Sequence, residues 1–276
     1  MCAEYSHLEG DTRCGLTVSR TTSLVATNPR YKSLKDYPNL TEVDVSDNTS
    51  ITNVTYLKKL VKLAARGKSA LTSKGIKGLR LTILDITNNP NITSVPESVT
   101  ELIASGSRCG LGSVASLQLL TKLTIDHNQL IVTLPPLPHL VELSARNTRL
   151  APDALTSLPK LAKLDLSGCQ TITDVSHLTS VTHVDISDSS VTQDGIGGLS
   201  LVYLNCSYNS GVLDLSSFTT IEHLVADGDT LTQEGLPPNV KTLSIEDNPN
   251  IVSVKHLTQL SHLDGDSDIV EAWLNI

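Results

Sequence analysis

Residues 161–172, LAKLDLSGCQTI, decide the fold. Leu161, Leu164 and Leu166 are spaced as L-x-x-L-x-L, and the pattern continues through Cys169 to Ile172. The same spacing recurs in nearly every part of the chain. A motif that returns at a fixed interval predicts a stack of similar layers rather than one compact core.

The period follows from the first apolar residue of each unit. Eleven intervals separate Leu40 from Leu260 and cover 220 residues, so the mean period is 20. Alternating apolar residues in each unit predict a short strand with one buried and one exposed face. An Asn at the ninth position of the motif is expected to bond backbone groups in the turn that follows. The twelve first positions are Leu40, Leu60, Leu81, Val99, Leu120, Leu140, Leu161, Val181, Leu201, Ile221, Val240 and Leu260.

These features predict an α/β solenoid shaped as a horseshoe. About twelve short strands form its parallel concave sheet, and the outer segments are mostly irregular or short helices. We predict an N-terminal cap with a degenerate first repeat at residues 1–37, repeats at 38–265 and a C-terminal cap at 266–276. The C-terminal cap is expected to be helical and to cover the last layer through residues at helical spacing. Those residues are Ile269, Val270, Trp273 and Leu274.

Over residues 40–265 the chain resembles the leucine-rich-repeat superfamily, whose units have this consensus and period. Residues 169–187, CQTITDVSHLTSVTHVDIS, are similar to microbial repeats of the internalin type. Residues 94–106, SVPESVTELIASG, and 235–243, GLPPNVKTL, are instead similar to the short repeats of bacterial effector proteins. The resemblance implies a horseshoe that binds another macromolecule. It leaves open whether the chain is the recognition domain of a larger effector or signalling protein.

Composition narrows the expected partners and location. The net charge of −8 disfavours nucleic acid and anionic membranes, and it favours a basic or neutral protein. No apolar run approaches the roughly 18 residues of a membrane span. The start, MCAEYSHLEGDTRCG, lacks the pattern of a signal peptide. We therefore expect a cytoplasmic protein, with a secreted effector as the alternative.

The chain carries no recognised catalytic motif. We find no metalloprotease HExxH, phosphate-binding P-loop, G-x-S-x-G or CxxC pair. Gly195, Gly197 and Gly198 are interpreted as a tight outer turn rather than a phosphate cradle. The expectation is a non-enzymatic scaffold or adaptor that needs no cofactor or metal.

The outward positions of the strands indicate where a partner binds. In the first half of the chain these positions alternate between Glu and Lys, which predicts a self-neutralised surface. In the second half, three adjacent strands carry His183, Tyr203 and His223. Tyrosine is enriched at binding hot spots, since it offers a broad apolar ring with a polar tip. The predicted partner-binding residues are His183, Asp185, Tyr203, Asn205, Tyr208, His223 and Asp227.

A less favoured alternative is a metal-dependent hydrolase in the same patch. His183, His223 and Asp185 are suitable zinc ligands, but strands two apart are separated by roughly 9.6 Å, which strains the geometry. Ser207 with His183 and Asp185 has the composition of a hydrolase triad, but nothing supplies an oxyanion hole.

Overall fold

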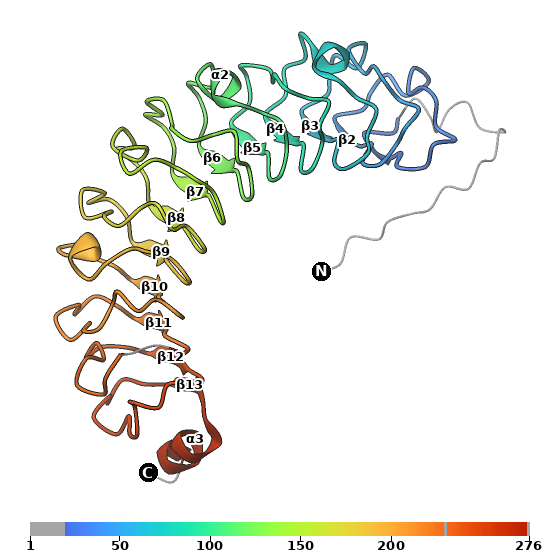
Figure 1. Ribbon diagram of the computed structural model, residues 1–276. Coiled ribbons are helices and arrows are strands. Elements are labelled where there is room, and N and C mark those ends of the chain that lie inside the picture. Colours follow the sequence, from blue (N-terminus) through green and yellow to red (C-terminus); the bar gives the residue numbers. More distant parts are fainter. Residues whose placement is uncertain (1–19, 229–230, 275–276) are drawn as a thin grey trace.

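The computed structural model describes residues 20–228 and 231–274. In these residues thirteen parallel strands pair in chain order and form one sheet on the inner side of an arc (Figure 1). The outer segments lie on the other side, so the predicted solenoid is confirmed. The strands are β1 (Ser23–Val25), β2 (Glu42–Asp44), β3 (Lys62–Ala64), β4 (Ile83–Asp85), β5 (Glu101–Ile103), β6 (Lys122–Thr124), β7 (Glu142–Ser144), β8 (Lys163–Asp165), β9 (His183–Asp185), β10 (Tyr203–Asn205), β11 (His223–Val225), β12 (Thr242–Ile245) and β13 (His262–Gly265).

In the three-residue strands β2 to β11 only the middle residue is buried. Leu63 in β3 and Leu164 in β8 are buried, whereas the residues on either side of each face the concave surface. Leucine, valine and isoleucine from every layer join into one continuous core. The concave side chains are therefore free to differ from layer to layer while the core pattern repeats.

β1 comes from the degenerate repeat that precedes Leu40. Leu24 pairs with Val43 of β2, so this first strand continues the register of the others. Residues 1–19 of the predicted N-terminal cap lie outside the described residues, and the limits of that cap stay a prediction.

The outer segments contain little regular structure, as predicted. The short helices are η1 (Ser73–Ile76), α2 (Leu111–Val114) and η2 (Asp194–Ile196). The turn predicted at Gly195–Gly198 is present: η2 ends there, and Gly198 has a φ of 78°. Only glycine adopts that backbone conformation without steric cost.

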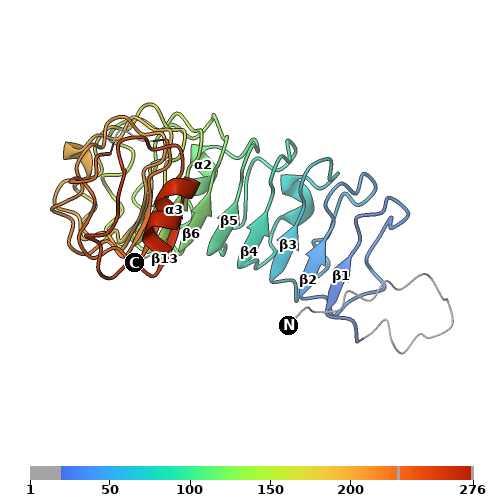
Figure 2. The same cartoon turned by 90° about the horizontal axis from the view of Figure 1, so that it is seen from below.

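The helix α3 (Ser267–Leu274) follows β13 and packs beside it (Figures 1 and 2). Ile269 is buried, and Val270 and Trp273 pack against the core. The prediction that Leu274 faces the core is wrong, because this side chain is 70% exposed. It is the final residue of the helix, where no layer remains for it to cover.

A ladder of buried asparagines holds the turns that follow the strands. Asn209 donates from Nδ2 to the carbonyls of Ile186 (3.0 Å) and Val191 (3.1 Å), and its Oδ1 accepts from the Gly211 amide (2.9 Å). Backbone groups buried away from water need such partners, so the predicted role of the ninth position is confirmed. The buried asparagines are Asn48, Asn89, Asn128, Asn209 and Asn248.

Candidate functional site

The predicted histidine and tyrosine side chains are neighbours on the concave sheet. Tyr203 pairs in register with His183 on one side and His223 on the other. The rings of His183 and Tyr203 stack, with centroids 6.1 Å apart and planes 15° from parallel. The Nδ1 atoms of His183 and His223 lie 2.9 Å from Thr182 Oγ1 and 2.8 Å from Thr242 Oγ1. These contacts hold both imidazoles in place on the sheet.

The acidic and amide residues of the predicted patch hold the strand ends. Asp185 accepts from the Ser187 amide (3.0 Å) and hydroxyl (2.7 Å), and Asn205 donates to Asp185 at 3.0 Å. Asp227 accepts from the Ser244 hydroxyl at 2.7 Å. These intramolecular hydrogen bonds fix the positions of the charged and amide groups on the sheet.

Tyr208 lies in the turn after β10, with a φ of 57° and 61% of its surface exposed. Its ring covers Gly228 of the next layer: a Cβ on that glycine would lie 2.2 Å from Tyr208 Cε1. The tyrosine therefore depends on a glycine one repeat later for its position.

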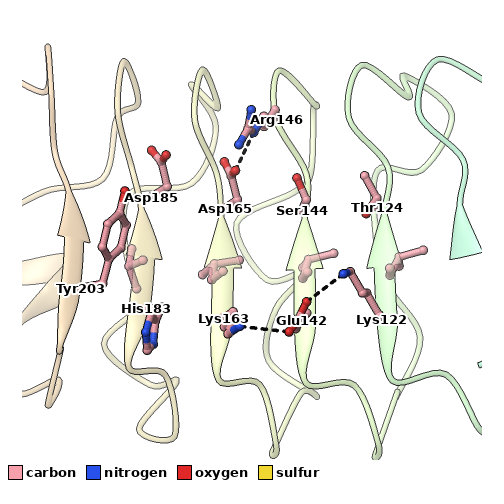
Figure 3. A pocket seen from close by; sticks show the side chains of 14 residues that line it. Lys122, Thr124, Glu142, Ser144, Arg146, Lys163, Asp165, His183, Asp185 and Tyr203 are labelled. Atoms are coloured by element: carbon pink, nitrogen blue, oxygen red, sulfur yellow. Dashed lines mark hydrogen bonds and ion pairs between the residues drawn. The ribbon is translucent and has the colours of Figure 1, made fainter. Parts of the chain in front are cut away.

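A shallow hollow of about 350 Å³ spans β6 to β10 on the concave face (Figure 3). It takes in His183, Asp185 and Tyr203 of the predicted patch. The other four predicted residues do not line it. Its polar lining consists of Lys122, Thr124, Glu142, Ser144, Arg146, Lys163, Asp165, His183, Asp185 and Tyr203.

Arg146 is a lining residue that sequence reasoning missed. Its Nε donates to Asp165 Oδ2 at 2.5 Å, and this hydrogen bond raises the pKa of the guanidinium. The sequence could have indicated this residue through its place in the repeat. Arg146 directly follows the third apolar residue of its unit, and the same place in the next two units is taken by Ser167 and Ser187. An arginine among small residues on a concave face is a candidate anchor for a partner.

The two ends of the hollow carry different charges, since aspartates lie near Tyr203 at one end and Glu–Lys pairs lie at the other. At the β8–β10 end the pKa of Tyr203 is raised, first by burial and then by the negative charges of Asp185 and Asp165. At the other end Glu142 lies 3.2 Å from both Lys122 and Lys163 (Figure 3). These partly exposed pairs confirm the predicted Glu–Lys alternation, and each contributes at most about 1 kcal/mol.

Glu142 gives a local test of this arrangement. Burial alone raises the pKa of its carboxyl group, but hydrogen bonds from Lys122 and Lys163 outweigh burial and leave the pKa lowered. A lowered pKa in the folded state means that the pairs stabilise the fold above the unfolded-state pKa and cease to do so as the pH falls through the folded-state pKa. In the variant Lys122→Ala/Lys163→Ala, we predict that the Glu142 pKa rises toward its ordinary value in an NMR titration.

The matched control for this titration is Lys241→Ala. Lys241 lies 2.8 Å from Glu222 and lowers the pKa of that carboxyl group instead. The control variant should leave the Glu142 pKa unchanged. A Glu142 pKa that does not move in the double variant would show that the lysines do not set it.

The described residues do not assemble the alternative metal site. Within ranges 20–228 and 231–274, no three His, Cys, Asp or Glu side chains are grouped to hold a metal ion. β10 lies between the strands of His183 and His223. The thiols of Cys109, Cys169 and Cys206 are buried, and burial raises the pKa of Cys109 to about 11.

In the part of the chain that the structure describes, no helix is both long and apolar enough to cross a membrane. The cytoplasmic location stays a prediction.

A family model described as a leucine-rich repeat matches residues 157–176, which is one unit of the solenoid. No curated protein matches the sequence significantly. Among solved structures, a leucine-rich-repeat protein of Leptospira interrogans matches 96% of this chain and 83% of its own, with 18% identity and a TM-score of 0.68. An internalin of Listeria monocytogenes matches 84% of this chain and 69% of its own, with 18% identity and a TM-score of 0.54.

A third match is the TLR13–ssRNA13 complex, with 20% identity and a TM-score of 0.63. It covers 89% of this chain and 47% of the TLR13 chain. At these identities the likeness is one of fold. The leucine-rich-repeat fold predicted from the sequence is confirmed. The similarity to effector repeats stays a prediction.

Proposed function

We propose that this leucine-rich-repeat chain is a non-enzymatic recognition module that holds a protein partner against its concave face. The observation that carries the proposal is the hollow across β6–β10, where a stacked tyrosine and histidine adjoin the Arg146–Asp165 pair. Tyrosine and arginine are among the residue types that most often dominate protein interfaces.

The rigidity of the concave face supports this proposal. Asp185 is bonded to its own turn and to Asn205 on the next strand, and His183 and His223 are held by threonines. Side chains already fixed in the free protein lose little conformational entropy when a partner docks. The surface is therefore suited to binding without rearrangement.

The charge of the concave face favours a basic or neutral protein. The third residue of each strand lies on the concave face. Over the thirteen strands this position is an aspartate five times and never a basic residue. Like charges would repel an RNA backbone laid along these strands, so the RNA of the TLR13 complex is a poor guide to this chain. The five aspartates are Asp44, Asp85, Asp165, Asp185 and Asp264.

A capture experiment tests the proposal. The folded wild type and the variant Tyr203→Ala/His223→Ala are used as baits in lysate of the source cells. We predict that the wild type retains a protein that the variant loses, because the variant removes two aromatic rings from adjacent strands. Bound proteins are identified by mass spectrometry.

The control bait is Leu130→Ala/Val132→Ala, which removes apolar side chains that are 55% and 45% exposed outside the strands. It should retain the partner. Equal recovery by the concave variant, or loss by the control alone, would place the binding surface elsewhere.

A further inference from the structure

The net charge of the chain conceals a strongly basic segment. Residues 48–84 contain eight Lys or Arg and no Asp or Glu, in a chain whose net charge is −8. The segment covers the second and third layers of the solenoid, from the turn after β2 to the middle of β4. Its basic residues are Lys58, Lys59, Lys62, Arg66, Lys68, Lys74, Lys77 and Arg80.

Two of these cations belong to the concave face and are paired there. Lys62 lies 3.0 Å from Glu42, and Arg66 lies 2.9 Å from Asp44. The cations of the outer segments differ. Among the described residues, none of them lies within salt-bridge distance of a carboxylate. Their charge is therefore available to a partner.

Hydrogen bonds hold the outer segments of the first three layers side by side. The Leu34 amide donates to the Tyr56 hydroxyl at 2.9 Å, and the Val54 amide donates to the Gly75 carbonyl at 2.9 Å. Gly75 fits so closely that a Cβ there would lie 2.2 Å from the carbonyl oxygen of Thr52. The cations on these segments therefore form one surface.

We call this surface the outer basic patch. Its six members come from three adjacent outer segments, and all are exposed. Lys35 lies over the Tyr56 ring at 5.9 Å, and Lys59 donates to Asn39 Oδ1 at 2.6 Å, so neither contact neutralises a charge. The members are Lys35, Lys58, Lys59, Lys74, Lys77 and Arg80.

A second hollow, of about 450 Å³, adjoins the patch at η1. Lys74 and Lys77 lie on one side of it, with Val95 and Pro96 from the next layer opposite. Glu97 is its one carboxylate. The hollow thus places apolar surface beside two cations that have no carboxylate partner among the described residues, which suits a peptide with alternating acidic and apolar side chains.

We propose that the outer basic patch and the hollow at η1 form a second interaction surface, which binds an acidic segment of another protein. The patch contains five lysines and one arginine, so it offers only a single planar guanidinium fork to clamp phosphates. The aromatic ring in contact with Lys35, that of Tyr56, is partly buried, whereas single-stranded nucleic acid binding relies on exposed rings.

This surface extends the function proposed for the concave face and does not depend on it. An acidic concave surface and a basic outer surface at the N-terminal layers select partners of opposite charge. The outer basic patch lies on the outer segments of the first three layers, whereas the concave hollow spans β6–β10 on the other side of the solenoid, so both partners can bind at once. The chain would then act as a scaffold that bridges them.

The test uses a fluorescent peptide of alternating glutamate and leucine, with fluorescence anisotropy as the readout. The variant Lys74→Glu/Lys77→Glu should weaken binding at low salt by about tenfold or more, because like charges then face the peptide. The control Lys160→Glu/Lys255→Glu changes the net charge equally at two exposed lysines of later layers, and Lys160 occupies the place in its unit that Lys59 has in its own. It should change the affinity by less than about twofold.

Three outcomes would overturn the proposal. The first is no binding of the peptide by the wild type at low salt. The second is an equal loss in both variants, which would indicate a response to net charge alone. The third is tighter binding of a single-stranded oligonucleotide or of phosphatidylserine vesicles than of the peptide. Thermal melts of both variants check that these exposed substitutions leave the fold intact.

Discussion

Replacing Asn209 with alanine is expected to lower the free energy of unfolding by about 2–4 kcal/mol. The amide of Asn209 is fully buried and serves the Ile186 and Val191 carbonyls and the Gly211 amide at once. Alanine leaves these backbone groups without that partner in a place that water does not reach. Urea denaturation followed by circular dichroism measures the loss.

Two controls separate this hydrogen-bonding role from a general effect of substitution. Asn209→Cys should cost less than Asn209→Ala, because Cys169 occupies the equivalent place and its thiol donates to the Ala145 carbonyl at 3.0 Å. Asn53→Ala, at an exposed turn, should cost less than about 1 kcal/mol. An alanine at 209 that is no more destabilising than the alanine at 53 would contradict the role given to the ladder.

Gly195→Ala is expected to destabilise the solenoid by about 3 kcal/mol, since overpacking against backbone cannot be relieved by a side-chain rotation. A Cβ at this position would lie 2.0 Å from the Thr173 carbonyl oxygen in the preceding layer. The two layers would have to move apart to accept it. Thermal melting compares the variant with the wild type.

The matched control is Gly198→Ala in the same turn. Gly198 has a φ of 78°, and a Cβ added there would have no other atom within 4 Å. Only the backbone conformation is therefore penalised, by about 1–2 kcal/mol. The larger loss should occur at Gly195. The opposite order would show that layer spacing is not what fixes this glycine.

The positions of the strands were predictable because the repeat fixes where each strand lies in its unit. Once Leu40 to Leu260 set the period, each alternating stretch had one residue to bury, and the observed strands begin two residues after those apolar positions. The exceptions lie at the ends. β1 falls in a repeat whose consensus is degenerate, and Leu274 follows helical spacing past the end of the core.

The concave site was predictable only in part. Register alone brought His183, Tyr203 and His223 together. The hollow across β6–β10 depends on how long side chains such as Arg146 and Lys163 lie on the sheet, and the spacing of apolar residues carries no information about that. The outer basic patch was not predicted because only the net charge of the whole chain was considered. That sum combines the positive charge of residues 48–84 with the negative charge of the other residues.

The affinity of the captured partner, measured by isothermal titration calorimetry, tests the central claim most directly. Binding to Tyr203→Ala/His223→Ala should be about tenfold or more weaker than to the wild type, as expected when hot-spot residues are truncated. Binding to Lys74→Glu/Lys77→Glu should stay within about twofold, because these lysines lie outside the concave sheet. Undiminished affinity for the concave variant, with loss in the outer variant, would contradict recognition on the concave face.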